Sequence, residues 1–377
     1  MPAILATIII AIVSFGSHIP LGIAETLFGI SLTIKSIIIF LLPTIIFGLL
    51  YKASVSLAKD ASKIVVLILF MVIVSNFTTT SLSQIIGTAI YNFDLSLTMP
   101  NENNSLQGRV FFLMPSLIAN HYAMFSGIII GMLAARANPL RAESLGTLFE
   151  TAVNVLLKFI TILIPVFVTG FVVKLQYDGI VTQILHSYTL IFAIVFISQV
   201  GYIFLLYFTV EKFKIKSTLV AIRNMLPAGL SGFSTMSSAA SMPLTIVGTE
   251  KNAQNKDLVH TVVPATVNIH LIGDCIAIPC FAYAILKNYD LPQPDIHTYF
   301  IFTFYFVIAK FSVAAIPGGG IIVMLPILEQ YLGFNTEMLS LITALYILFD
   351  PIITGSNVLG NGAFARIIDR IISRKHC

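Results

Sequence analysis

Long apolar stretches separated by short polar loops recur along the first half of the chain. Each is close to or above the length of about 20 residues that a helix needs to cross a bilayer. They lack the strict alternation of apolar and polar residues that marks the strands of a membrane barrel. The pattern therefore predicts six membrane-spanning helices. Their expected ranges are residues 3–20, 24–50, 63–92, 109–135, 146–175 and 182–211.

Positive charges in the loops give these helices a direction. Lys and Arg gather in three loops, at residues 51–63, 136–141 and 212–216, which share one side if successive helices alternate. The loops of the other side, at residues 94–107 and 176–180, contain neither Lys nor Arg. Because basic residues are enriched in cytoplasmic loops, we expect both termini in the cytoplasm. The expected location is the plasma (inner) membrane, with a multi-pass chain.

Two apolar stretches in the second half are interrupted by residues that break helices. The first, at residues 217–248, contains Pro227, Gly232 and a run of Ser, Thr and Ala, and both of its flanks are basic. The second, at residues 297–332, breaks at residues 316–320, and both of its ends are expected outside. Opposed segments that enter and return are typical of inverted-repeat transporters, in which irregular backbone lines a solute site. The alternative is an ordinary kinked span, which two breaks in matching positions disfavour.

Composition strengthens the membrane interpretation. The 377 residues are 57% hydrophobic and 10% charged, with a mean hydropathy of +0.95, whereas soluble domains average about 25% charged residues. The net charge of +4 resides mostly in loops and does not indicate nucleic-acid binding. The three cysteines fit no disulfide framework or tight metal cluster, so no cofactor or metal beyond a coupling ion is expected. Residues 1–14 are expected to begin the first helix rather than to form a signal peptide.

A carboxylate lies within the last apolar stretch, at residues 339–367. Asp350 precedes Pro351, whose missing N–H frees a backbone carbonyl, so this position is suited to an ammonium group or a cation. Ionised groups at membrane depth are costly and mark functional sites by default. The alternative is an internal ion pair with Lys158 or Lys310.

Further polar residues surround this acid in the sequence pattern. Asn357 and Asn361 follow Asp350 on the same helix face, where they either contact the solute or join helices. Thr235, Ser237, Ser238 and Ser241 cluster at the first break, where hydroxyls and free N–H groups suit a carboxylate. Close packing of small residues is the alternative there.

His270 and Asp274 are four residues apart in the apolar stretch at residues 260–286, so a continuous helix would place them on one face. A proton relay or cation site and a mutually satisfied polar pair remain equally open. Gly229-Leu230-Ser231-Gly232 also fits the short pattern of an intramembrane serine protease, with His270 as its base. That match is weak, and no enzyme activity is expected.

Four segments carry a resemblance to a known family. Phe233-Ser-Thr-Met-Ser-Ser-Ala-Ala-Ser-Met-Pro243 is similar to the serine-rich first hairpin of the dicarboxylate/amino acid:cation symporters, the glutamate transporter family. Ala315-Ile-Pro-Gly-Gly-Gly320 resembles the tip of their second hairpin, and residues 350–361 match their last helix without gaps. Residues 40–47 resemble their apolar, proline-containing second helix.

The resemblance implies an all-α membrane protein with eight transmembrane helices and two opposed re-entrant hairpins. It also implies a homotrimer whose transport domain moves like an elevator past a fixed scaffold. Residues 1–216 would form six helices, the scaffold with part of the transport domain, and residues 217–377 the transport core. The expected function is secondary active transport, by symport, of an amino acid or a related small carboxylate.

The resemblance also assigns roles to residues. Ser237 and Ser238, with Asn357, would hold the substrate α-carboxylate, and Asp350 would hold its α-amino group. The backbone of the second tip would form the outer gate. The expected substrate-binding residues are Ser237, Ser238, Ile316, Pro317, Gly318, Gly319, Gly320, Asp350, Ile353, Thr354 and Asn357.

Two departures from the family pattern change the expected substrate and its coupling. Arginine is missing at both positions where acidic-substrate members carry it, which are Ile353 and Met236 here, so we expect a neutral amino acid. A dicarboxylate or glutamate carrier, or an exchanger, is the alternative, and a sensor or leak channel on the same fold is another. In the sodium motif, asparagine becomes His270 and aspartate becomes Ile272, while Asn361 replaces a second acid. Proton coupling or weak coupling is therefore favoured over full sodium coupling. The expected coupling residues are His270, Gly273, Asp274, Asn357 and Asn361.

Overall fold

The computed structural model describes most of the chain and is helical in every regular element that it describes. The described residues are 7–8, 11–12, 14–59, 63–92, 106–108, 112, 114, 118, 120–313 and 318–373. Within these residues, four helices are long and apolar enough to cross a membrane, and a fifth, bent helix joins them if it is counted as one span. The protein is therefore a multi-pass α-helical membrane protein.

The long helices match most of the spans expected from the apolar pattern. A short 3-10 turn, η1 (Gly16–His18), precedes α2 (Leu21–Lys59), and α3 (Lys63–Tyr91) follows. Further long helices are α5 (Pro139–Tyr177), α6 (Ile180–Val210) and α13 (Thr336–Ser373), the last in the chain. The expected span at residues 3–20 lies largely outside the described residues. That at residues 109–135 overlaps α4 (Asn120–Ala137) in its second part only.

Proline explains the bend in α5. The helix turns by 41° between its parts at residues 139–160 and 165–177. Pro165 begins the second part, where it removes one backbone hydrogen bond and crowds the preceding turn.

Six shorter helices lie between α6 and α13 and are arranged as three interrupted pairs. The first pair is α7 (Ile215–Thr235) and α8 (Ser238–Glu250). The second is α9 (Lys256–Thr266) and α10 (Ile272–Asn288), and the third is α11 (Ile296–Lys310) and α12 (Gly319–Leu332). The second break corrects one expectation, because residues 267–271 are not helical and the stretch at residues 260–286 is not one continuous helix.

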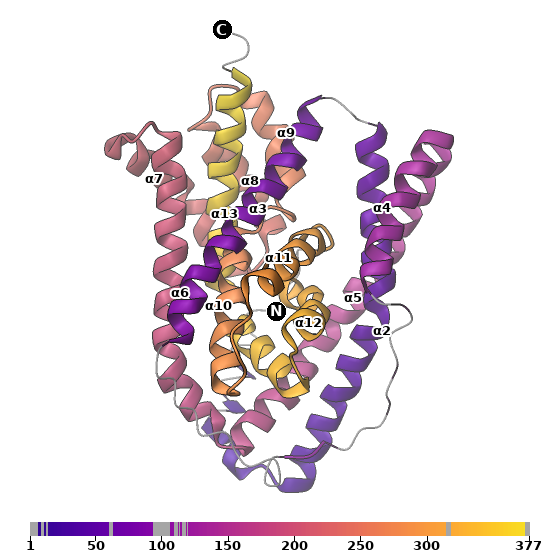
Figure 1. Ribbon diagram of the computed structural model, residues 1–377, viewed down its shortest axis with the longest axis vertical. Coiled ribbons are helices and arrows are strands. Elements are labelled where there is room, and N and C mark those ends of the chain that lie inside the picture. Colours follow the sequence, from indigo (N-terminus) through magenta and orange to yellow (C-terminus); the bar gives the residue numbers. More distant parts are fainter. Residues whose placement is uncertain are drawn as a thin grey trace.

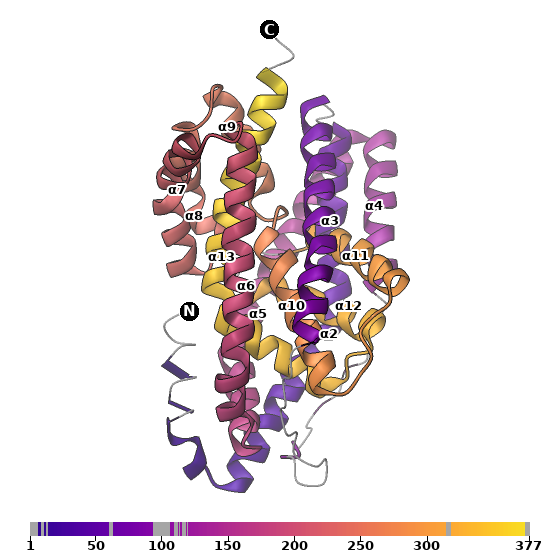
Figure 2. The same ribbon diagram turned by 60° about the vertical axis from the view of Figure 1, so that its left-hand side comes forward.

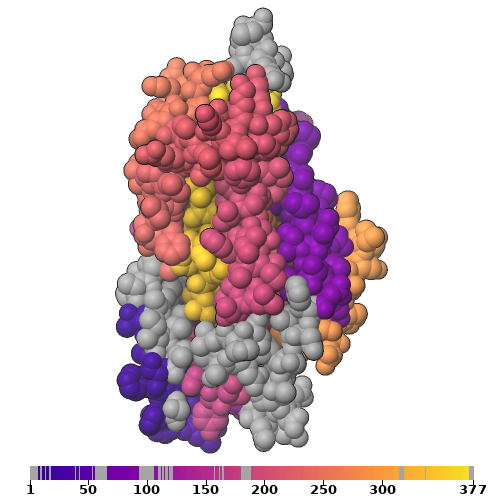
Figure 3. All heavy atoms as spheres, turned by 90° about the vertical axis from the view of Figure 1, so that its left-hand side faces the viewer, coloured from indigo at the N-terminus to yellow at the C-terminus, as the bar shows by residue number. Residues whose placement is uncertain are grey.

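The helices form two groups that meet along the middle of the molecule. α2 packs against α4 and α5 on one side, and α7, α8 and α9 surround α13 on the other (Figure 1). α10 packs against α3, α6 and α13. It lies near the middle of the molecule in both ribbon views (Figure 1 and Figure 2). In the space-filling view a strip of α13 is visible between α6 and the α7–α8 pair (Figure 3).

Burial follows the membrane interpretation. α10 is buried along nearly its whole length, and α13 is largely enclosed. By contrast, α6 exposes large apolar side chains such as Phe196, Ile197 and Leu205. An apolar exposed face is stable in lipid and would be a liability in water. The enclosed helices α10 and α13 carry the polar residues discussed next.

Candidate functional site

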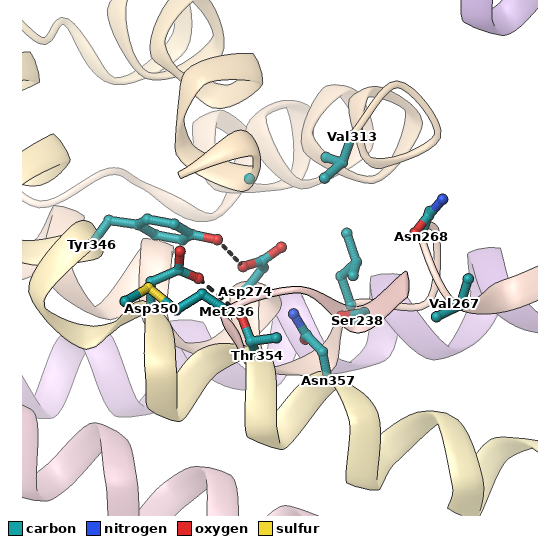
Figure 4. A pocket seen from close by; sticks show the side chains of 12 residues that line it. Met236, Ser238, Val267, Asn268, Asp274, Val313, Tyr346, Asp350, Thr354 and Asn357 are labelled. Carbon is teal, nitrogen blue, oxygen red and sulfur yellow. Dashed lines mark hydrogen bonds between the residues drawn. The ribbon is translucent and has the colours of Figure 1, made fainter. Parts of the chain in front are cut away.

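A small cavity lies where the three helix breaks meet α13. Its volume is about 30 Å³, which has room for ordered water and not for an amino acid. An amino acid can therefore enter only if the surrounding segments move apart. Figure 4 shows polar side chains converging on it from several elements. The lining residues are Met236, Ser238, Val267, Asn268, Leu271, Asp274, Val313, Gly320, Tyr346, Asp350, Thr354 and Asn357.

The first break brings Met236 and Ser238 to the cavity. Met236 adopts a left-handed backbone (φ 49°) that ends α7, and Ser237 caps α8 by accepting a hydrogen bond from the Ala240 N–H at 3.3 Å. Ser238 is the first residue of α8 and is 8% exposed. The free N–H groups of this helix start and the Ser238 hydroxyl therefore lie at the cavity, whereas the Ser237 side chain is used as a cap.

One face of α13 supplies Asp350, Thr354 and Asn357. The Asp350 carboxylate is 3% exposed and accepts hydrogen bonds from the Gly318 N–H and the Thr354 hydroxyl, each at 3.0 Å. Asn357 accepts one from the Gly273 N–H at 2.8 Å, which joins α13 to the start of α10. These residues stand in successive turns of one helix, as the sequence spacing predicts.

Asp350 has no ion-pair partner among the described residues, contrary to the alternative expectation. Lys158 is exposed on α5, and Lys310 pairs with a different acid. The Lys310 ammonium lies 3.1 Å from Asp274, which also accepts a hydrogen bond from the Tyr346 hydroxyl at 2.8 Å (Figure 4). Asp350 is thus a buried carboxylate held by neutral donors, beside a neutralised Asp274.

His270 and Asp274 do not form the expected pair. Because the chain is irregular up to Leu271 and α10 begins at Ile272, the two side chains do not share a helix face. The His270 ring bonds to the Ser75 hydroxyl at 2.8 Å and packs on Phe364. Neither it nor Asn361 lines the cavity.

Asn361 instead joins α13 to α9. It accepts a hydrogen bond from the Thr266 hydroxyl at 2.5 Å. Of the five expected coupling residues, only Asp274 and Asn357 line the cavity, while Gly273 lies directly behind them through its bond to Asn357.

The second predicted tip is described in part. Ile316 and Pro317 lie outside the described residues. Gly318 has a left-handed backbone (φ 73°) and caps α12, which begins at Gly319. Gly320 lines the cavity. Ile353 is fully buried and does not line the cavity, contrary to expectation, because its backbone carbonyl packs against Gly273.

Several lining residues were not predicted. Asn268, Val267 and Leu271 line the cavity because the chain is irregular at residues 267–271, which was not expected. The sequence signal that could have identified Asn268 was a polar residue within an apolar stretch. Tyr346 precedes Asp350 by one helical turn, a spacing that would have placed it on the same face. Nothing in the sequence indicated that Val313 would line the cavity, apart from its closeness to the second tip.

The geometry of an intramembrane serine protease is not present among the described residues. The Ser231 hydroxyl accepts a hydrogen bond from Ser241 at 3.0 Å, and His270 bonds to Ser75. Ser231 and His270 are therefore engaged with different partners, without the nucleophile–base contact that this chemistry requires.

Comparison with known proteins agrees with a transporter rather than an enzyme. The model of the sodium:dicarboxylate symporter family matches residues 1–371. Excitatory amino acid transporter 1 of Ambystoma tigrinum is 28% identical over 256 residues, covering 66% of this chain and 46% of that protein. The Homo sapiens form is 27% identical over the same coverage. Excitatory amino acid transporter 4 of Mus musculus is 24% identical over 305 residues, covering 78% of this chain and 51% of its own length.

The chain spans about half the length of these curated relatives. The family match, however, extends over nearly the whole chain. The chain therefore belongs to the sodium:dicarboxylate symporter family.

Proposed function

We propose that this protein is a secondary active transporter for a small amino acid with an uncharged side chain. The observation that carries the proposal is Asp350, a buried carboxylate in a cavity without any basic side chain among its described lining residues. A carboxylate held only by neutral donors can accept the ammonium group of an amino acid. A substrate bearing a second carboxylate would have to bury it without a partner, which is costly.

The opposite end of the substrate would face the starts of three helices. α8, α10 and α12 each begin at the cavity, so their free N–H groups favour a negatively charged group there. In this proposal Ser238 and Asn357 bind the substrate α-carboxylate directly, and Ser237 orients the start of α8. Thr354 holds Asp350, and Met236 forms part of the apolar surroundings of the substrate side chain.

Entry of the substrate would require the second tip to move. The cavity is too small for an amino acid, and the Gly318 N–H donates directly to the Asp350 carboxylate. We propose that Ile316–Gly320 is the gate, and that substrate displaces this bond. The α7–α8 and α11–α12 pairs would be re-entrant hairpins that join eight transmembrane helices.

The remaining parts of the proposal concern the whole protein. Residues 217–377 would form the core of a transport domain that moves like an elevator past a scaffold drawn from residues 1–216. The assembly would be a homotrimer in the plasma (inner) membrane with cytoplasmic termini. Coupling would use protons or be weak, with His270, Gly273, Asp274, Asn357 and Asn361 as the candidate residues.

A dicarboxylate or acidic amino-acid carrier is the second candidate function. The description of the matching family favours it. It requires a cationic partner for the additional carboxylate, and Lys310, a buried cation beside the cavity residue Asp274, is already paired with that acid.

Binding to purified protein tests these proposals. We expect neutral amino acids to raise the melting temperature and to bind saturably, and aspartate, glutamate and succinate to bind weakly. Asp350→Asn removes the charge that holds the ammonium group, so affinity should fall about 10- to 100-fold. Asp257→Asn, on the exposed first turn of α9, is the matched control and should bind as the wild type does. Saturable aspartate or glutamate binding without neutral amino-acid binding would exclude the proposed substrate class.

A further inference from the structure

A fully buried ion pair forms part of the cavity wall. The Lys310 side chain is 0% exposed and that of Asp274 is 2% exposed, with 3.1 Å between the Lys310 Nζ and the Asp274 Oδ2. The Tyr346 hydroxyl donates to the other carboxylate oxygen at 2.8 Å. Lys310 is the last residue of α11, Asp274 lies in the first turn of α10 and Tyr346 belongs to α13, so the three side chains join α11 to the core helices α10 and α13.

Such a pair is not explained by stability alone. Removing two charges from water costs several kcal/mol per ion, and apolar replacements of buried pairs are often as stable or more stable. Ionisable side chains at membrane depth usually mark the path of a substrate or an ion. Asp274 lines the cavity directly, and Lys310 lies behind it against the ring of Phe306, at 4.6 Å from the ring centroid.

The surroundings of Lys310 favour a cation independently of Asp274. Lys310 is the last residue of α11, where the negative end of the helix dipole favours a cation. Ser312, two residues further, is fully buried, and its hydroxyl has no hydrogen-bond partner among the described residues. Carboxylate, carbonyl and hydroxyl oxygens are the ligand types that hard cations such as sodium prefer.

A sodium ion, which the family name implies, does not fit beside Asp274 as the side chains are arranged. Both carboxylate oxygens already accept hydrogen bonds, one from an ammonium group. The charge that a free cation would supply is already present on Lys310.

We propose that the Lys310 ammonium is a built-in counter-cation that takes the place of a free sodium ion at Asp274. Closure of α11–α12 over the cavity then neutralises Asp274 from within the chain, and sodium is not required at this position. When Lys310 and Asp274 separate, water solvates both charges. When they come together again, the two charges neutralise each other. This inference specifies the ion coupling of the proposed transporter. Its consequence for transport rests on the proposed function, whereas the sodium response of the purified protein does not.

The variant Lys310→Met tests the inference, because it removes the cation and leaves Asp274 uncompensated. Thermal unfolding of the full-length protein is measured in sodium chloride and in N-methyl-D-glucamine chloride at equal ionic strength. We expect the wild type to unfold at the same temperature in both salts. Lys310→Met should be destabilised without sodium, and sodium should raise its melting temperature saturably by about 3 °C or more.

Two further variants separate ion binding from general destabilisation. The double variant Asp274→Asn with Lys310→Met lacks both charges and should show no response to sodium. Lys158→Met removes an exposed lysine of α5 and should behave as the wild type in both salts. A wild type that responds saturably to sodium would overturn the inference. It would also be overturned if Lys310→Met were equally unstable, or unfolded, in both salts, because the pair would then be structural only.

Transport measurements distinguish failure of this inference from failure of the proposed function. If wild-type vesicles take up no amino acid, the proposed function fails, and the sodium response of the two charge variants still decides the inference. If the wild type transports a neutral amino acid only when sodium is present, the function stands and the counter-cation role of Lys310 is wrong.

Discussion

At the residue scale, the site depends on a close approach that only glycine allows. A Cβ atom at Gly320 would collide with the Tyr346 hydroxyl and lie 3.0 Å from the Asp274 carboxylate. The absence of a side chain therefore lets the start of α12 reach the cavity wall and close it. Asp350 takes part in the same closure through its bond to the Gly318 N–H.

Gly320→Ala should destabilise the protein by about 1–3 kcal/mol, because the added methyl group overpacks this contact. The double variant Gly320→Ala with Tyr346→Phe removes the colliding oxygen and should recover part of the loss. Gly201→Ala is the control, since nothing lies within 4 Å of a Cβ there, and it should be neutral or slightly stabilising. Thermal or denaturant unfolding measures all three. Equal stability of Gly320→Ala and Gly201→Ala would contradict the steric account.

At the element scale, the helix breaks were predictable where the sequence itself breaks the helix. Pro and Gly at residues 316–320 indicated the interruption that ends at Gly318, and the Ser-rich run indicated the one at Met236 and Ser237. α7 continues through Pro227 and Gly232, and Gly232 instead lets α7 approach the backbone of α13.

The break at residues 267–271 was missed because no Gly or Pro marks it. Hydrogen bonds from a distant helix, α3, stabilise this irregular backbone instead. The Asn76 side chain donates to the Ile269 carbonyl at 2.7 Å and accepts from the Leu271 N–H at 3.3 Å. Such long-range contacts cannot be read from local sequence. Most of the apolar spans and the positions of Asp350 and Asn357 at the cavity were predicted, whereas the contributions of Asn268 and Tyr346 were missed.

Asn76→Ala should therefore weaken the α9–α10 break specifically. It leaves a buried N–H and a buried carbonyl without partners, and we expect a loss of about 1–3 kcal/mol together with weaker substrate binding. Thr78→Ala, on the exposed face of the same helix, should change stability by less than about 0.5 kcal/mol. Unfolding and binding assays on both variants check this. If the two substitutions had the same effect, Asn76 would not support the break.

At the scale of the whole molecule, charged side chains clamp one end of the core. Asp369 is fully buried and accepts hydrogen bonds from the N–H groups of Gln254 and Asn255, at 2.9 and 3.1 Å. It also pairs with Arg366, which reaches Glu211 at the end of α6. The clamp joins the α8–α9 turn, α6 and α13 into one unit.

Asp369→Asn should loosen this clamp, because one amide oxygen replaces two charged acceptor atoms and leaves donors poorly satisfied. We expect a loss of about 1–3 kcal/mol, and faster proteolysis of the α8–α9 turn. Asp290→Asn, at an exposed position after α10, is the control and should be nearly neutral. Unchanged stability and proteolysis of Asp369→Asn would show that the clamp is dispensable.

The central claim is that a neutral amino acid is carried through the cavity at Asp350. Counterflow in vesicles tests it most directly, with purified protein, an internal pool of unlabelled neutral amino acid and labelled substrate outside. The account predicts transient accumulation of label by the wild type and by Asp257→Asn, and a loss of about 10-fold or more in Asp350→Asn. Accumulation by Asp350→Asn equal to the wild type, or exchange of acidic substrates alone, would contradict it.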